Sequence, residues 1–170
     1  RQASAPAVKR TGLSSALMAL HESIIYGPVK SRRLGRSLGV NLTPAHVKLC
    51  SFNCTYCQYG WSKLSRSEDG RSLESWPSPQ AVVRAVSRVL RTFAVKGESI
   101  DRLTLAGHGE PTMHPRFAEV VDALRALRDK IVPGVPIAVL SNASTLEHAD
   151  VRTALATLDE RYMKLDAGDT

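Results

Sequence analysis

The 170-residue sequence contains only three cysteines, and all of them lie between Cys50 and Cys57. A secreted disulfide framework spreads an even number of cysteines along the chain, so this distribution excludes one. It favours metal or redox chemistry in a reducing compartment, and we expect a cytoplasmic protein. The sequence also lacks any run of about 18 apolar residues, which excludes a membrane-spanning helix. We therefore expect no membrane partner.

Negative charge is scarce as well, with 16 acidic residues against 23 basic ones and a net charge of +7. Sixteen of the basic residues are arginines, which bind phosphate and carboxylate through a bidentate fork. An anionic partner, including an RNA substrate, is compatible with this charge. The alternative is a solvated, arginine-rich surface.

Length and a hydrophobic content of 43% favour one domain with a real core. Residues 1–24 read as an N-terminal arm with a short amphipathic helix, and residues 25–170 as the core. Within the core, the glycines and prolines of residues 27–44 predict a loop or hairpin.

After residue 45, patterns typical of strands and helices alternate. We expect strands at residues 46–49, 102–106, 136–141 and 161–168. Helices are expected from Ser78-Pro79 to Gly97, over residues 116–130 and over residues 145–158. This alternation predicts an α/β fold in which right-handed β-α-β units build a parallel sheet.

Polar and glycine-rich segments follow each expected strand. They cover residues 50–57, 107–111, 141–144 and 166–169. Because ligands of parallel α/β folds bind at the C-terminal ends of the strands, these segments predict one shared site.

The cysteines follow the pattern C-x3-C-x2-C. Thiolates select zinc, copper(I) or iron-sulfur clusters, and three of them leave one coordination position open. Open positions are typical of catalytic sites, whereas a structural zinc site needs a fourth ligand. The five histidines could supply that ligand, with His108 and His114 as the first candidates.

With Tyr56 just before the last cysteine, this motif resembles the signature of the radical S-adenosylmethionine (radical SAM) superfamily. The resemblance implies that Cys50, Cys54 and Cys57 bind a [4Fe-4S] cluster whose fourth iron is chelated by S-adenosyl-L-methionine (SAM), with Tyr56 near the adenine. It implies an iron-sulfur oxidoreductase that cleaves SAM reductively to a 5'-deoxyadenosyl radical. An electron donor such as flavodoxin or ferredoxin is then expected, and no substrate or catalytic residue can be named.

The turn "GHGEP" resembles the Gly-Gly-Glu-Pro turn with which the family holds the methionyl amino group of SAM. The resemblance implies SAM-binding roles for Gly107, Gly109, Glu110 and Pro111, although His108 replaces a glycine. Glycine lets the backbone approach a ligand closely, and proline fixes the exit of the turn.

The ends of the third and fourth expected strands are also candidates. Ser141, Asn142 and Ser144 could contact ribose hydroxyls, or they could equally be helix caps and turn formers. Asp166 resembles the polar ribose-side residue of the family, and Lys164 would face the same side of its strand.

The segment "GPVKSRRLGRSLGVNL" resembles one branch of the superfamily, the iron-sulfur oxidoreductases related to wyosine-type tRNA-modifying enzymes. Its Arg32, Arg33 and Arg36 would contact a phosphate or carboxylate, or they are solvated charges on a hairpin.

Radical SAM cores usually contain six β/α units in a partial barrel, and this chain offers about four. We therefore expect a partial (β/α) barrel with parallel strands that is truncated after about four units. A missing C-terminal segment or a partner chain would then complete the barrel. The rival interpretations are a non-catalytic zinc- or Fe-S-binding module with an RNA-associated surface, and an inactive fragment of a radical SAM protein.

Overall fold

The computed structural model describes residues 23–62 and 76–165, and its centre is one five-stranded sheet in the order β1-β2-β3-β4-β5. The strands are β1 (Ile25–Ser31), β2 (Gly35–Val40), β3 (Arg102–Leu105), β4 (Ile137–Ser141) and β5 (Glu160–Met163). β1 and β2 form an antiparallel hairpin, and β2 to β5 run parallel to one another. The expected α/β fold with parallel strands is therefore confirmed.

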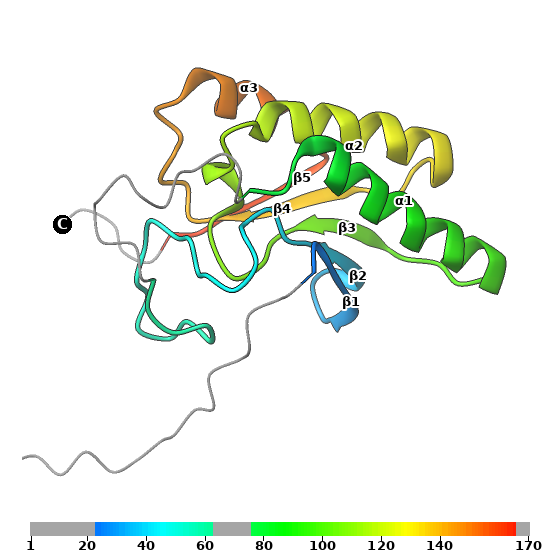
Figure 1. Ribbon diagram of the computed structural model, residues 1–170, viewed down its shortest axis with the longest axis horizontal. Helices are drawn as coiled ribbons and strands as arrows, with labels where there is room; N and C mark the ends of the chain where they lie inside the picture. Colours follow the sequence, from blue (N-terminus) through cyan, green and yellow to red (C-terminus); the bar gives the residue numbers. More distant parts are fainter. Residues whose placement is uncertain (1–22, 63–75, 166–170) are drawn as a thin grey trace, which may run out of the picture.

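Helices connect the parallel strands. They are α1 (Pro79–Lys96), α2 (Phe117–Ile131) and α3 (Ala149–Ala156), with a short 3-10 helix η3 (Pro111–Met113) after β3. Figure 1 shows the three α-helices together on one face of the sheet. The C-terminal ends of β4 and β5 point toward the segment that carries the cysteines.

The first parallel strand is Gly35–Val40, so the prediction of a strand at residues 46–49 was wrong. His46 has a φ of 65°, in the left-handed region, which no strand residue adopts. Residues 41–49 instead form an irregular connection between β2 and the cysteines. The hairpin expected within residues 27–44 is confirmed by β1 and β2.

The core lies between the sheet and the helices. Leu103 and Leu105 of β3 are almost fully buried, and they belong to the same hydrophobic cluster as Val82 and Val86 of α1. Strand residues two apart share a face, and helix residues four apart do the same, which brings these side chains together. Burial of each such side chain contributes about 1.5–3 kcal/mol to the free energy of folding.

The ends of α1 follow the sequence prediction. Ser78 Oγ accepts a hydrogen bond from the Ala81 N–H at 3.2 Å, and Gly97 ends the helix with a φ of 66°. α3 is shorter than predicted, because residues 143–148 form hydrogen-bonded turns before Ala149. The fourth expected strand forms over Glu160–Met163 and does not include residues 164 and 165, and its last three expected residues, 166–168, lie outside the described residues.

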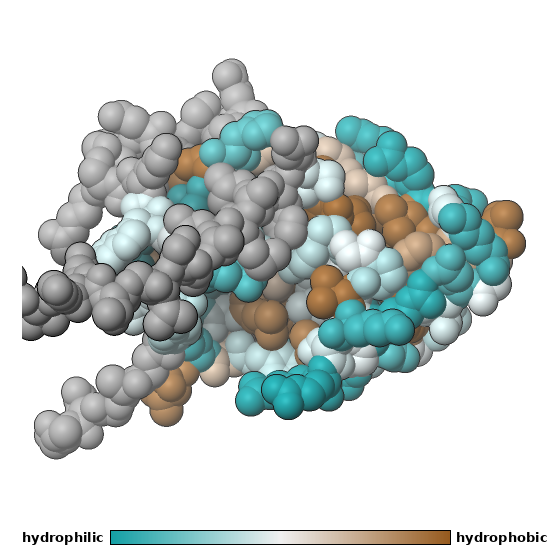
Figure 2. All heavy atoms as spheres, turned by 90° about the horizontal axis from the view of Figure 1, so that it is seen from below, coloured by the Kyte–Doolittle hydropathy of each residue, from teal (hydrophilic) through white to brown (hydrophobic). Residues whose placement is uncertain are grey.

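Figure 2 views the molecule from below, the side opposite to the helices in Figure 1, and apolar residues lie in the middle of this view. Exposed apolar side chains at the end of the sheet include Leu140 and Met163. Among the described residues, no helix combines the length and the hydropathy that crossing a membrane requires. The N-terminal arm expected at residues 1–24 falls largely outside the described residues and stays a prediction.

Candidate SAM and iron-sulfur site

A hollow of about 680 Å³ lies at the C-terminal ends of β3, β4 and β5. Of the predicted site residues, it is lined by Cys50, Cys54, Tyr56, Cys57, Gly107, Gly109, Glu110 and Asn142. Pro111 is buried as the first residue of η3 and does not line the hollow. Asp166 lies outside the described residues. The parallel strands therefore bring the cysteine, glycine-rich and asparagine segments to one place.

Ser62 closes the loop that carries the cysteines. Its hydroxyl donates to the Lys48 carbonyl at 3.0 Å and accepts from the Cys50 N–H at 3.4 Å. Its own N–H donates to Asn53 Oδ1 at 2.6 Å. The two ends of the loop are thus joined, and the cysteines between them are held at the rim of the hollow.

Each cysteine sulfur accepts a hydrogen bond from a different part of the chain. Asn142 Nδ2 donates to Cys50 at 3.6 Å. Lys164 Nζ donates to Cys54 at 2.6 Å, and Lys48 Nζ donates to Cys57 at 3.2 Å. All three cysteines are free and half-buried.

Tyr56 is 69% exposed and lines the hollow, with the Lys164 ammonium 4.6 Å from the centre of its ring. This is a cation–π contact, and at an exposed site such a contact contributes about 0.5–1 kcal/mol of stabilisation. Lys164 therefore connects the end of β5 to two residues of the cysteine loop.

The glycines of the "GHGEP" turn are required by close packing inside the protein. A Cβ atom at Gly109 would lie 2.0 Å from the Leu49 carbonyl oxygen, and one at Gly107 would lie 2.0 Å from Asn41 Oδ1. The Glu110 N–H also donates to the Leu49 carbonyl at 2.8 Å. The turn thus holds the segment that enters the cysteine loop, in addition to lining the hollow.

Glu110 is 2% exposed, and its carboxylate links two of the segments around the hollow. Oε1 accepts from the N–H and the hydroxyl of Thr112 and from the Ser141 hydroxyl. Oε2 accepts from the Asn142 N–H at 2.7 Å. The carboxylate therefore fixes the end of β4 against the turn after β3.

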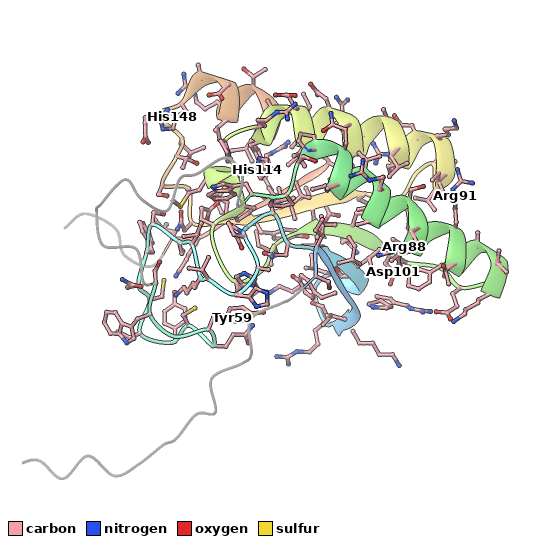
Figure 3. All side chains as sticks on the ribbon, viewed as in Figure 1. Tyr59, Arg88, Arg91, Asp101, His114 and His148 are labelled. Atoms are coloured by element: carbon pink, nitrogen blue, oxygen red, sulfur yellow. The ribbon has the colours of Figure 1, made fainter. Side chains whose placement is uncertain are left out.

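The polar residues after β4 divide between two roles. Asn142 lines the hollow, and its Oδ1 accepts from the Ser144 N–H in a local turn. Ser144 instead contacts the Ser51 hydroxyl and lines a separate hollow of about 410 Å³ beside His114 and His148. Figure 3 shows both of these histidines on the helix side of the molecule, whereas Tyr59 lies on the cysteine loop.

Neither histidine suspected as a fourth metal ligand is grouped with the cysteines among the described residues. His108 Nε2 pairs with the Pro44 carbonyl at 2.9 Å, and His114 Nε2 pairs with the Pro77 carbonyl at 2.8 Å. Burial lowers the pKa of both imidazoles below the ordinary histidine value, although these carbonyl contacts oppose the shift.

The three arginines of the hairpin lie in different surroundings. Arg36 forms an ion pair with Glu98 and its guanidinium stacks over the Phe93 ring, so it serves the structure. Arg32 is exposed, and Arg33 is exposed but lines the hollow. Only Arg33 keeps a position from which it could contact an anionic ligand there.

Electrostatics around Cys50 reflect opposing effects. Burial raises the pKa of its thiol, the Phe52 N–H lowers it, and the negative charge of Glu110 raises it again. The positive charge of Lys48 acts in the opposite direction to Glu110. Lys48 is 4% exposed, and the sequence analysis gave it no role.

The donor set fits an iron-sulfur cluster better than a single ion. Within residues 23–62 and 76–165, no three His, Cys, Asp or Glu side chains are grouped as the ligands of one metal ion would be. The thiolates of a cluster each bind a different iron atom, so three cysteines that line one hollow suit it. The side chains that donate to the three sulfurs are also of the kind that tunes such clusters.

Comparisons with known proteins identify similar chains and a family. "UPF0026 protein" of Helicobacter pylori and of Methanocaldococcus jannaschii are each 35% identical over 147 residues, 86% of this chain. The chain spans 43% and 41% of their lengths, less than half of either. A crystal structure of archaeal TYW1 is similar with a TM-score of 0.48 and 19% identity, over 79% of this chain and 44% of that one. The family model of the radical SAM superfamily matches residues 45–168. The chain therefore belongs to the radical SAM superfamily.

Proposed function

We propose that this chain binds a [4Fe-4S] cluster through Cys50, Cys54 and Cys57, and binds SAM beside it in the hollow, as a radical SAM iron-sulfur oxidoreductase. One observation carries the proposal: the three cysteines of a superfamily member line the same hollow as Gly109, Glu110 and Asn142. Its volume of about 680 Å³ lies within the ordinary range of cofactor pockets.

When bound, the cluster and SAM would supply the one-electron chemistry, and the chain's own residues would position them. Among the described residues, Oε2 of Glu110 accepts a hydrogen bond from the Asn142 N–H alone, which leaves an acceptor position for the methionyl ammonium of SAM. Tyr56 offers an exposed ring at the rim of the hollow for contact with the adenine. We further propose that a small carrier such as flavodoxin or ferredoxin delivers the electron.

A zinc-binding module is the second candidate, and the positions of the histidines count against it. A closed zinc site with three thiolates needs one more ligand, and within the described residues neither His108 nor His114 is grouped with the cysteines. Three thiolates around a hollow that is open to a small molecule favour the cluster.

Anaerobic reconstitution of the protein with iron and sulfide tests the proposal. We expect about four irons and four sulfides per chain, from the cluster formula. We also expect a change in the electron paramagnetic resonance spectrum of the reduced cluster when SAM is added. Reduction with dithionite in the presence of SAM should then release 5'-deoxyadenosine.

Variants separate cluster binding from unspecific iron. Cys50→Ala, Cys54→Ala and Cys57→Ala should each lose the cluster, whereas Ser51→Ala, in the same loop, should retain it. Tight binding of one zinc in place of iron would contradict the proposal. A full cluster whose spectrum does not respond to SAM would leave the superfamily assignment intact and remove the proposed activity.

A further inference from the structure

Lys48 places a positive charge inside the protein next to a predicted cluster ligand. The residue is 4% exposed, and its ammonium donates to Cys57 Sγ at 3.2 Å and to the Gly60 carbonyl. No carboxylate among the described residues forms an ion pair with it. A buried ammonium without a counter-charge costs several kcal/mol, so this position calls for a neighbouring negative charge.

The cysteine loop is arranged around this ammonium. Lys48 lies before the first cysteine, and Gly60 lies after the last one, so the two contacts of its ammonium join both sides of the loop. The Ser62 hydroxyl holds the Lys48 carbonyl in the same closure. The backbone around Lys48 is thus fixed, and its side chain reaches the sulfur from the protein interior rather than from solvent.

Lys164 differs from Lys48, although it also donates to a cysteine sulfur. It is half-buried at the end of β5, and its ammonium stands over the exposed Tyr56 ring. Charge at a solvent-facing position is screened by water, whereas charge in the interior acts through a low dielectric. Of the two lysines, Lys48 is therefore the one whose charge water screens less.

We propose that the buried charge of Lys48 raises the reduction potential of the cluster that the three cysteines would hold. This role rests on the proposed function. Reduction adds one electron, and so one negative charge, to the cluster. A cation beside one of its thiolates stabilises that added charge. Net charge and hydrogen bonds to the sulfurs are among the factors that set the potentials of such clusters.

The test is a redox titration of the reconstituted protein, with dithionite as the reductant and electron paramagnetic resonance as the readout. Lys48→Met, which keeps much of the side-chain stem, and Lys48→Gln, which keeps a donor, should both shift the midpoint potential to more negative values. Lys48→Arg should keep a potential close to that of the wild type. Lys96→Met, at the exposed end of α1, is the matched control and should not shift the potential.

The outcomes separate this inference from the proposed function. A wild-type protein that takes up no cluster overturns both. A wild-type cluster that responds to SAM, together with Met and Gln variants of unchanged potential, overturns the role of Lys48 alone. If these two variants lose the cluster while Lys48→Arg retains it, the requirement for charge is supported. Loss of the cluster in all three variants shows a requirement for shape and overturns the inference.

Discussion

The Ser141 hydroxyl donates to Oε1 of Glu110 across 2.8 Å, and this contact joins the ends of two parallel strands. Ser141 is the last residue of β4, and Glu110 follows β3. Both side chains are buried, at 5% and 2% exposure. The rim of the hollow is therefore held by a carboxylate at the end of the sheet, as well as by the helices behind it.

Glu110→Gln tests this joint. The glutamine amide keeps one acceptor oxygen and replaces the other with an NH₂ group. In one orientation that group faces the Asn142 N–H, and in the other it faces the donors of Thr112 and Ser141. A buried donor facing another donor costs about 1–3 kcal/mol, and we expect the free energy of unfolding to fall by that amount. Urea unfolding followed by circular dichroism measures it.

Glu119→Gln is the matched control, because Glu119 is exposed and pairs only at the surface with Arg116. Such a pair contributes about 0–1 kcal/mol, so this variant should unfold near the wild-type midpoint. Equal midpoints for Glu110→Gln and the wild type would show that the joint carries no stability.

The pH dependence of stability should report the buried His114. Its Nδ1 accepts from the Arg116 N–H at 3.0 Å and its Nε2 contacts the Pro77 carbonyl, so the folded protein holds the neutral ring. Burial lowers its pKa in the folded state, so the unfolded state binds the proton more readily. The resulting stability is fully present above the unfolded pKa of about 6.5 and is lost as the pH falls through the folded pKa.

We therefore expect the free energy of unfolding to decrease from pH 7 toward pH 5, and His114→Gln to reduce this slope. One proton can contribute at most about 1.4 kcal/mol per pH unit. Urea unfolding at several pH values checks the slope, with His148→Gln as the control because His148 is exposed. His108, whose pKa burial also lowers, should retain its share of the slope in the His114 variant. An unchanged slope would contradict the neutral, buried form of His114.

The sequence predicted α1 well and the first parallel strand poorly, for physical reasons. α1 combines a serine cap, a proline in the first turn, valines at helical spacing and a terminal glycine, and these local signals agree. Strand β2 reads "GRSLGV", with two glycines that weaken any strand pattern. Its parallel pairing with β3 makes it the first parallel strand, and no local pattern encodes that pairing.

The residues around the hollow were predictable because polar segments follow parallel strands and meet at one end of the sheet. The contacts between these segments were not. Lys48 points inward because residues 41–49 take an irregular path, and that path depends on the close approach of Gly109 to Leu49. Such tertiary contacts leave no periodic signal in the sequence.

Ser78→Ala tests the start of α1. The hydrogen bond from the Ala81 N–H to Ser78 Oγ would be lost, and in the first turn of the helix only water could then accept from this N–H. We expect a loss of about 1 kcal/mol in the free energy of unfolding. Ser99→Ala, an exposed serine in the loop after α1, should be neutral in the same thermal unfolding experiment. A Ser78 variant as stable as the Ser99 variant would show that the proline alone sets the helix start.

Gly109→Ala tests whether the turn after β3 positions the cysteine loop. The added Cβ would lie 2.0 Å from the Leu49 carbonyl oxygen and 2.6 Å from Thr43 Cγ2. The carbonyl cannot move aside freely, because it accepts the hydrogen bond from the Glu110 N–H. Its displacement would move Cys50, the next residue. We therefore expect a loss of about 1–3 kcal/mol in the free energy of unfolding, the usual range for overpacking, together with reduced iron incorporation.

Gly134→Ala separates the two effects of the Gly109 substitution. Gly134 has a φ of 85°, and a Cβ there meets no atom within 4 Å. Alanine should cost about 1–2 kcal/mol through backbone strain alone and leave the iron content unchanged. If Gly109→Ala loses stability but incorporates wild-type amounts of iron, the turn stabilises the fold without positioning the cysteines. Loss of iron from Gly109→Ala, but not from an equally destabilised Gly134→Ala, would assign the positioning of Cys50 to the contact between Gly109 and Leu49.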